Sequence, residues 1–246
     1  MAMRILVTND DGIQSEGLRT LAVWAKKLGD VTVCAPKKQQ SAKSHAICIH
    51  SPIEVCKYEF GENITAYSVD STPVDCVRFA TIGLQQEYDL ILSGINNGYN
   101  LGEDILYSGT VANIFEARLR NVRGIAFSTE HDKFLSDACY LDLVYDFITR
   151  NKLFDYNTIY NVNIPDIPNG KILLTRQGGA YFTDEFVKLD DTHYDQRGYS
   201  VYKFGTNLEL DTDATMNGYV SVTPLSVIRD DREAFNKLIK IISKTK

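Results

Sequence analysis

The first forty positions alternate between short apolar runs and one longer amphipathic run. Residues 4–8 contain the apolar run Ile5-Leu6-Val7, which predicts a buried strand. Residues 16–28 place leucine and alanine at helical spacing, and Gly29 is suited to end that helix. A second apolar run at residues 31–35 predicts another strand. A strand, a helix and a strand in one compact unit favour a parallel sheet.

The same alternation continues to about residue 150. Thr72 is a helix-capping residue and Pro73 fits a first helical turn, so we predict a helix from there to Leu84. Further helices are predicted at residues 110–119 and 134–148, and further strands at residues 90–92 and 125–127. A loop rich in glycine and asparagine is expected from Ser93 to Ser108. This order predicts a doubly wound, mostly parallel α/β sheet.

Beyond residue 150 the pattern becomes rich in short strands. Strands are predicted at residues 161–164, 172–175, 181–189, 199–204 and 219–222, and a final helix includes residues 238–242. We therefore expect one domain over residues 1–246. Its core spans about residues 1–150, and a β-rich C-terminal extension, about residues 151–246, completes it.

Composition narrows the possible partners. The chain has 246 residues and a formal net charge of −6, which counts against nucleic acid because binding its phosphates requires a basic face. The five cysteines are scattered without a Cys-x-x-Cys pair, as expected in a reducing compartment. Only three apolar residues follow Arg4 before polar residues interrupt the run, and no run reaches the length of a membrane span. We therefore expect a cytoplasmic protein without nucleic-acid or membrane partners.

Three polar loops occur at the ends of predicted strands or the starts of predicted helices. They are Asn9-Asp10-Asp11-Gly12, Ser93-Gly94-Ile95-Asn96 and Tyr107-Ser108-Gly109-Thr110-Val111. Open α/β sheets bind their ligands at the carboxyl ends of the strands, where such loops meet. Each loop taken alone is equally compatible with an ordinary turn or a helix cap.

Two adjacent carboxylates follow the first predicted strand. At ~4 Å and an effective dielectric constant near ~20, two such charges repel by about 4 kcal/mol, so a cation or a proton is needed to offset them. Asp10 and Asp11 therefore indicate a hard divalent cation, Mg²⁺ or Mn²⁺, and Asn96 can add an amide oxygen. The alternative is that both carboxylates point to water or cap the following helix.

The turn before the helix at residues 110–119 supplies an anion site. Gly109 allows close approach of a ligand to the backbone, and the N–H groups of a helix N-terminus favour an anion beside Ser108 and Thr110. A cation opposite such a terminus is the arrangement that phosphoryl transfer requires.

With these residues the chain resembles the survival protein E family of 5′/3′-nucleotidases. The strongest matches are Arg4-Ile5-Leu6-Val7-Thr8-Asn9-Asp10-Asp11-Gly12, the loop from Ala35-Pro36 to Ser41, Ser71-Thr72-Pro73-Val74-Asp75-Cys76-Val77, residues 93–102 and residues 107–111. Weaker matches follow at residues 161–165, at Asp195 with Arg197-Gly198, at Thr212-Asp213 and at residues 218–225. The similarity spans nearly the whole chain in the family's order.

The resemblance implies a Rossmann-like core, a site and an activity. One divalent metal ion per subunit, Mg²⁺ or Mn²⁺, is expected to be held by Asp10, Asp11, Ser41 and Asn96. The substrate phosphate is expected at Asn96, Ser108, Gly109 and Thr110, with Asp10 and Asp11 as the catalytic residues. Family members hydrolyse nucleoside 5′- and 3′-monophosphates, and some also cleave short polyphosphate. A C-terminal hairpin exchanged between subunits is also implied, and we expect a homodimer or homotetramer.

Three positions depart from the family pattern. Lys43 stands where a small residue is usual, Ser71 replaces a frequent glycine and Asn113 replaces a frequent alanine. None is an expected ligand, although Lys43 adds positive charge at the rim, where it bears on substrate preference. The histidines at His50, His131 and His193 are expected to be surface or loop residues. His45 lies near Ser41 in the sequence, and we assign it no role.

Two other classes of protein also carry functional residues directly after their first strand. A receiver-like signalling module also holds Mg²⁺ with an acidic pair and is not a hydrolase, but such a module is about half this length and the expected aspartate after a later strand is missing. A dinucleotide-dependent oxidoreductase would need a G-x-G-x-x-G turn, and Asp10 and Asp11 would repel its pyrophosphate.

Overall fold

The predicted N-terminal unit is present in the computed structural model, which describes residues 2–130 and 133–243. Its elements are β1 (Met3–Thr8), α1 (Glu16–Ala25) and β2 (Gly29–Pro36). The two strands pair in parallel. Helix α1 ends three residues before its predicted end at Leu28, because the N–H groups of Lys27 and Leu28 bond the carbonyls three residues back, at 3.1 and 2.9 Å, and so leave the α-helical pattern. Strand β2 then begins at Gly29, close to the first strand. A Cβ atom on Gly29 would lie 2.0 Å from the carbonyl oxygen of Met3.

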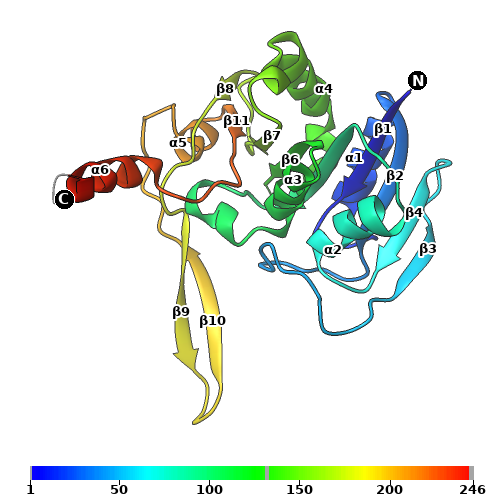
Figure 1. The fold of residues 1–246 in the computed structure, drawn as a ribbon, viewed down its shortest axis with the longest axis horizontal. Helices are drawn as coiled ribbons and strands as arrows, with labels where there is room; N and C mark the ends of the chain where they lie inside the picture. Colours follow the sequence, from blue (N-terminus) through cyan, green and yellow to red (C-terminus); the bar gives the residue numbers. More distant parts are fainter. Residues whose placement is uncertain (1, 131–132, 244–246) are drawn as a thin grey trace.

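A large mixed sheet forms the centre of the molecule. Its other strands are β3 (Val55–Glu59), β4 (Thr65–Val69), β5 (Leu90–Asn97), β6 (Arg123–Thr129), β7 (Ile159–Ile164), β8 (Ile172–Leu174) and β11 (Val220–Pro224). Within the described residues the strand order is β3-β4-β2-β1-β5-β6-β7-β11-β8 (Figure 1). Only the β3–β4 and β7–β11 neighbours in that order run antiparallel. Strands β3 and β4 were not predicted.

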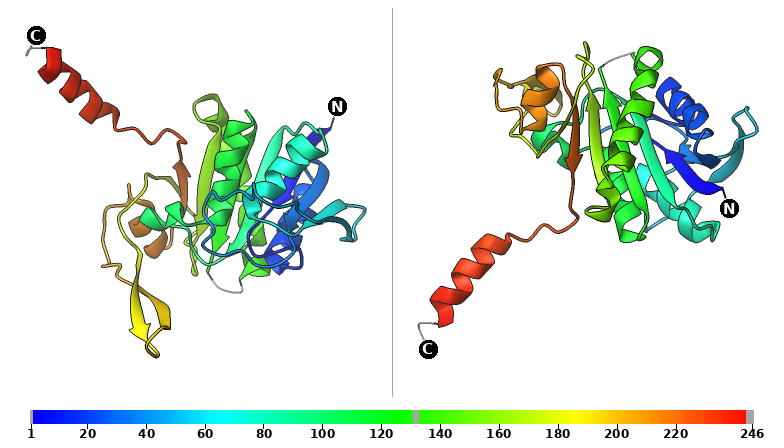
Figure 2. Two further views of the ribbon diagram at one scale, coloured as in Figure 1. Left: turned by 60° about the horizontal axis from the view of Figure 1, so that its bottom comes forward. Right: turned by 90° about the horizontal axis from the view of Figure 1, so that it is seen from above.

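Helices cover both faces of this sheet, which confirms the doubly wound α/β prediction. Helices α1 and α4 (Phe134–Arg150) pack on one face, where Leu21, Trp24 and Val144 are buried in a common core. Helices α2 (Pro73–Arg78) and α3 (Gly109–Leu119) cover the opposite face (Figure 2). The loops at the carboxyl ends of β1 and β5 therefore open between the two helical layers.

Two elements differ from their predicted extents. The helix expected to reach Leu84 leaves α-geometry after Arg78 and becomes a π-helical turn, Phe79–Gly83. The hydroxyl of Thr81 donates to the carbonyl of Val77 at 2.8 Å, a side-chain bond that competes with the α-helical ladder. Strand β5 does not end in a loop at Ser93. A bulge between Ser93 and Asn96 lets its pairing with β6 resume.

The chain after residue 150 divides into two parts. Strands β7, β11 and β8 extend the central sheet, and short helix α5 (Asp211–Met216) precedes β11. Strands β9 (Phe182–Lys188) and β10 (Tyr194–Ser200) instead form a separate hairpin that projects from the body, and α6 (Arg232–Ser243) also stands away from it (Figures 1 and 2).

The strand predicted at residues 199–204 is wrong beyond Ser200. Register explains this, because Ser200 pairs with Phe182, the first residue of β9, and no partner strand extends further. Tyr202 instead donates its hydroxyl to Asp213 at 2.8 Å. No helix in the described ranges is long and apolar enough to cross a membrane.

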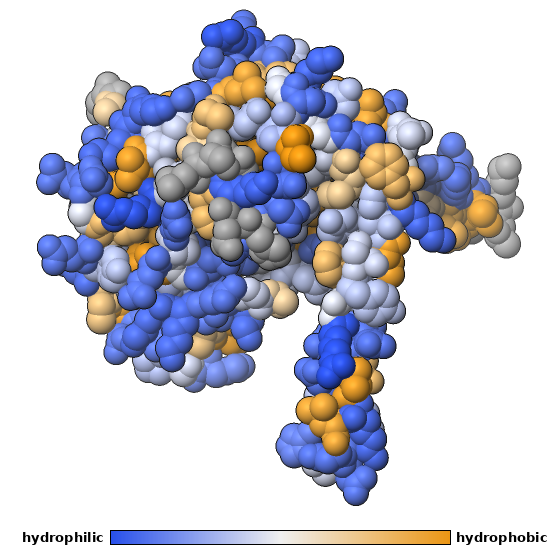
Figure 3. All heavy atoms as spheres, turned by 180° about the vertical axis from the view of Figure 1, so that it is seen from behind, coloured by the Kyte–Doolittle hydropathy of each residue, from blue (hydrophilic) through white to orange (hydrophobic). Residues whose placement is uncertain are grey.

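The projecting hairpin and α6 expose large apolar side chains. Phe186 is 67% exposed on β9, and Phe235 is 60% exposed on α6. Figure 3 shows apolar side chains on the hairpin, away from the main body. Apolar surface of this kind commonly marks a contact with another molecule.

Candidate active site

The three polar loops meet in one cavity at the carboxyl edge of the sheet. β1 is central and lies beside β5, so the loops that follow these strands become neighbours. The cavity has a volume of about 180 Å³. Its lining includes the predicted residues Asp10, Asp11, Ser41, Asn96 and Ser108, together with Ala42, Asn97, Asn100, Asp104 and Tyr107.

Asp10 lies against the N-terminus of α3. Its side chain is almost fully buried, and its Oδ1 accepts a hydrogen bond from the hydroxyl of Thr110. A Cβ atom on Gly109 would lie 2.8 Å from Cβ and 2.9 Å from Oδ2 of Asp10, so only glycine allows this approach. Gly109 and Thr110, predicted to bind phosphate, both lie against Asp10, but unlike Ser108 they do not line the cavity.

Burial makes the negative charge of Asp10 unfavourable. Loss of solvent raises the pKa of Asp10 to about 6, the hydrogen bond from Thr110 opposes this rise, and the charge of Asp11 adds to it. A cation at this point would favour ionised Asp10. The carboxylate pair predicted from the sequence is therefore present in a setting that a cation would stabilise.

Asp11 is oriented by two donors. The backbone N–H of Asn97 lies 3.1 Å from its Oδ2, and the amide nitrogen of Gln39 lies 3.3 Å from its Oδ1. The same Gln39 nitrogen lies 3.0 Å from Oγ of Ser41. Gln39 thus joins Ser41 to the acidic pair, a contact that sequence reasoning missed because glutamine in a loop carries no distinctive signal.

Asn96 presents an oxygen to the cavity. Its Nδ2 donates to the carbonyl of Gly98 at 2.8 Å, which leaves its Oδ1 facing Thr110 at 3.4 Å. Carboxylate, amide and hydroxyl oxygens form a donor set suited to a hard divalent cation. Within residues 2–130 and 133–243, no three His, Cys, Asp or Glu side chains cluster as a metal site. A cation here therefore needs the neutral oxygens of Ser41 and Asn96 beside the two carboxylates.

A buried polar layer supports the first loop from behind. Asn9 donates to Oγ of Ser15 at 2.6 Å and to the carbonyl of Gly12 at 3.1 Å, which fixes the turn after Asp11. Asn113 donates to Oγ of Ser93 at 3.0 Å, while its Oδ1 has no hydrogen-bond partner. The departure from alanine at position 113 thus places an amide directly beneath the site loops. The available signal was an asparagine between the apolar residues Ala112 and Ile114.

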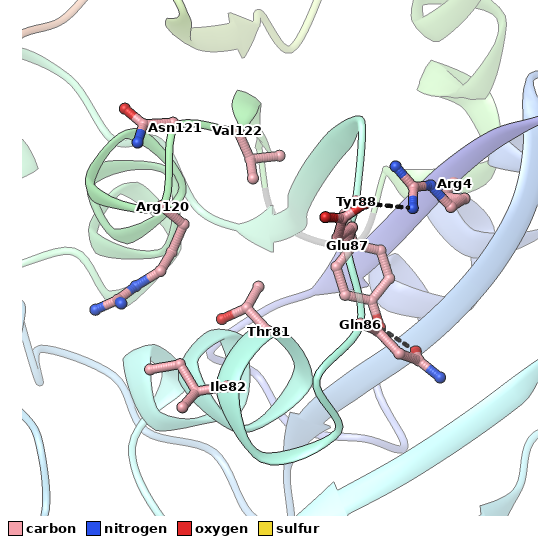
Figure 4. A pocket seen from close by; sticks show the side chains of 9 residues that line it. All are labelled: Arg4, Thr81, Ile82, Gln86, Glu87, Tyr88, Arg120, Asn121 and Val122. Atoms are coloured by element: carbon pink, nitrogen blue, oxygen red, sulfur yellow. Dashed lines mark hydrogen bonds and ion pairs between the residues drawn. The ribbon is translucent and has the colours of Figure 1, made fainter.

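A wider hollow lies at the opposite edge of the sheet. It has a volume of about 450 Å³, and Arg4, Glu87, Tyr88 and Arg120 help to line it (Figure 4). Its charged groups are already engaged, since Arg4 lies 3.1 Å from Glu87 and Arg120 lies 2.8 Å from Glu116. The smaller cavity therefore remains the better candidate, because it gathers Asp10 and Asp11 beside the oxygen-bearing side chains of Ser41 and Asn96.

Comparison with known families agrees with this choice. The family model described as "Survival protein SurE" matches residues 5–184, which includes every predicted site residue. The chain belongs to the SurE family. A 5′-nucleotidase SurE of Caldanaerobacter subterraneus subsp. tengcongensis is 38% identical over 95% of both chains. One from Legionella pneumophila is 36% identical over 98% of both.

The fold is shared with a solved structure of the SurE family. A crystal structure of the SurE protein from Aquifex aeolicus superposes with a TM-score of 0.76 at 31% identity, and the match covers 97% of this chain and 99% of that one. The similarity thus extends past the family-model region into the C-terminal extension.

The histidines of this SurE-family chain lie in different settings. His50 is exposed and His193 lies in the hairpin turn, as expected, whereas His131 lies outside the described residues. His45 is partly buried, and its ring nitrogen Nε2 lies 3.1 Å from Glu116. This contact was not predicted, because Glu116 is 71 residues away in the sequence.

Proposed function

We propose that the chain is a metal-dependent phosphomonoesterase that hydrolyses nucleoside 5′-monophosphates, and also 3′-monophosphates, to nucleoside and phosphate. The observation that carries this proposal is the buried Asp10 carboxylate packed against the N-terminus of α3 beside Asp11. Relatives named 5′-nucleotidase SurE that align over nearly the whole chain support the choice of substrate. Short polyphosphate is a further substrate in this proposal.

The residues present fit one Mg²⁺ or Mn²⁺ ion per subunit. Asp10, Asp11, Ser41 and Asn96 would hold it through oxygen atoms that line one cavity. When bound, such an ion neutralises phosphate charge and makes a water molecule more acidic.

The chain's own groups bind and orient the ester. Ser108 caps α3 by accepting from the N–H of Val111 at 3.0 Å, which leaves the start of the helix facing the cavity. We assign the phosphate to this helix start, at Ser108, Gly109 and Thr110, with the amide of Asn96 beside it. The hydroxyl of Thr110 donates its single proton to Asp10, so in this proposal it positions that carboxylate while the helix N-terminus binds the phosphate.

Asp10 has a second role in this scheme. Its Oδ1 is engaged by Thr110, so we assign Oδ2 to orient the attacking water and to accept its proton. Water attacks phosphorus, the bond to the sugar oxygen breaks, and the leaving oxygen takes up a proton from solvent. Asp11, held by Asn97 and Gln39, stays a ligand.

The assembly belongs to the same proposal. The projecting β9–β10 hairpin and α6 expose apolar side chains that a second copy of the chain would cover. We propose a homodimer or homotetramer in which this hairpin is exchanged, working in the cytoplasm without nucleic-acid or membrane partners. The net charge of −6 supports the absence of a nucleic-acid partner.

A substrate panel tests the activity. Phosphate release is measured from AMP, 3′-AMP, p-nitrophenyl phosphate and tripolyphosphate with Mn²⁺, with Mg²⁺ and after EDTA. We expect release from AMP with either metal and none after EDTA. Failure to release phosphate from any ester with metal present would favour the receiver-like alternative, to which the comparisons lend no support.

A further inference from the structure

The loop that carries Ser41 is held mainly by polar contacts, such as the bond from the N–H of Gln40 to the carbonyl of Asp10 at 2.7 Å. It runs from the end of β2 at Pro36 to the start of β3 at Val55 without a helix or strand. Ser41 itself is exposed, and the apolar residues Ile47 and Ile49 are 43% and 70% exposed. Hydrophobic burial therefore contributes little here, and specific polar contacts must fix the loop.

The backbone just after Ser41 is also strained. Ala42 has a φ angle of 57° and Ser44 has one of 51°. This left-handed conformation is unfavourable for residues other than glycine. Two such residues within three positions persist only where the surroundings hold them. The contacts of Ser44 and His45 therefore help to hold this conformation.

Residues 44 and 45 dock on the segment that begins the phosphate site. The N–H of Ser44 donates to the carbonyl of Tyr107 at 2.9 Å, and its hydroxyl donates to that of Leu106 at 2.7 Å. His45 reaches further along the same segment, where its Nε2 lies 3.1 Å from Oε2 of Glu116. The His45 ring also stacks on Phe115, with ring centres 6.4 Å apart and planes 20° apart.

Glu116 is a fixed acceptor for this contact. Its side chain is only 3% exposed, and Arg78 and Arg120 bind its other oxygen at 3.2 and 2.8 Å. Burial alone would raise the pKa of Glu116, but the bonds from His45 and Arg120 outweigh it and lower the pKa to about 2. An ionised carboxylate only accepts hydrogen bonds, so the Nε2 of His45 is the donor, and a neutral imidazole suffices.

We infer that His45 is a positioning residue for the metal site: its bond to buried Glu116 locks the Ser41 loop onto α3, the helix whose N-terminus contacts Asp10. This inference rests on the proposed function, because it takes Ser41 as a metal ligand. His45 does not line the cavity, and it acts on the ion through residues 42–44, which join it to Ser41.

Metal binding without substrate tests the inference. The dissociation constant for Mn²⁺ is measured by electron paramagnetic resonance of the free ion, with thermal unfolding recorded for each variant. His45→Phe keeps a ring against Phe115 but removes the donor, and we expect its dissociation constant to rise about tenfold. His45→Gln restores a donor, and we expect it to recover most of the wild-type affinity. His193→Phe breaks a matched histidine–carboxylate contact, 2.9 Å to Asp190 in the hairpin, and should leave Mn²⁺ affinity unchanged.

The possible results separate the two proposals. Wild-type protein that binds no Mn²⁺ overturns the proposed metal site and this inference with it. Wild-type binding with unchanged affinity in a folded His45→Phe overturns the inference alone. Should His45→Phe not fold, Ser44→Ala removes the neighbouring bond to Leu106 and must weaken Mn²⁺ binding in the same direction. An unchanged affinity in that variant also rejects the inference.

Discussion

The carboxyl edge of the sheet and the projecting hairpin break the usual rule of burial in opposite ways. At the edge, polar groups such as Asp10, Asn9 and Asn113 are buried. On the hairpin and α6, large apolar groups such as Phe186 and Phe235 are exposed. Each arrangement costs free energy in the isolated chain, the first through lost hydration and the second through apolar surface in water. In our proposal a cation and an anion complete the edge, and another copy of the chain covers the hairpin.

The largest effect is expected from Asp10→Asn, which removes the buried charge at the edge. We expect turnover of AMP with Mn²⁺ to fall on the order of 10³-fold, because the variant loses a ligand and the proton acceptor. Asp89→Asn is the control, since Asp89 pairs with Arg4 at the opposite edge of the sheet. Near wild-type turnover by Asp10→Asn would remove the acidic pair from the reaction.

Asp10→Asn should also change the stability of the metal-free protein. The pKa of Asp10 is raised from 3.8 to about 6 in the folded protein, so the folded state binds this proton more tightly than the unfolded state does. Stability is therefore lost as pH rises from about 4 to about 6. In EDTA at pH 7, Asp10→Asn should be more stable than wild type by up to about 3 kcal/mol. Urea unfolding at pH 4 and pH 7 measures the difference, which should be small at pH 4.

The next effect is expected from Gly109→Ala. The new methyl group would lie 2.8 Å from Cβ of Asp10 and 3.0 Å from Cγ of Pro73, so Asp10 must move. We expect turnover to fall about 100-fold, because small displacements at a reacting centre are costly, and stability to fall by about 1–3 kcal/mol. Gly179→Ala provides the control, since no atom lies within 4 Å of its added Cβ. Equal turnover in the two variants would show that the close approach at Gly109 is dispensable.

A smaller effect is expected from a substitution in the hairpin, which should weaken assembly of the subunits. Phe186→Asp places a charge on a side chain that is 67% exposed in the single chain and, in our proposal, buried between subunits. We expect the dissociation constant of the oligomer, measured by analytical ultracentrifugation, to rise about 30-fold. Ile167→Asp is a matched control, because Ile167 is 78% exposed on the body. An oligomer of wild-type strength in Phe186→Asp argues against exchange of the hairpin.

The two regions also differ in how far the sequence predicted them. The carboxyl edge was predicted from the apolar runs of β1 and β5 and from the loop motifs that follow them. This was possible because hydrophobic periodicity and turn-forming residues can be recognised from short stretches of sequence. The sequence did not predict three other features. They are the contact of His45 with Glu116, the bulge that keeps Asn96 on β5, and the register that ends β10 at Ser200. These depend on contacts between distant residues, which no local pattern records. Ser41 came only from the family resemblance, since an exposed serine in a loop has no distinctive spacing.

The smallest effect we expect concerns acid stability, and it compares the buried carboxylate of Glu116 on α3 with the exposed carboxylate of Asp190 in the hairpin. Glu116 has a pKa lowered from 4.5 to about 2, so its contribution is present above pH 4.5 and is lost as pH falls towards 2. Glu116→Gln should therefore destabilise the protein by about 1.5 kcal/mol at pH 7 and by less near pH 3, as measured by urea unfolding. Asp190 in the exposed hairpin also has a lowered pKa, because the backbone N–H of Thr192 and then the ring of His193 bind its carboxylate, but solvent screens these contacts. Asp190→Asn should leave the acid profile unchanged. If both variants shifted the profile equally, burial would not be what makes the charge of Glu116 contribute to stability.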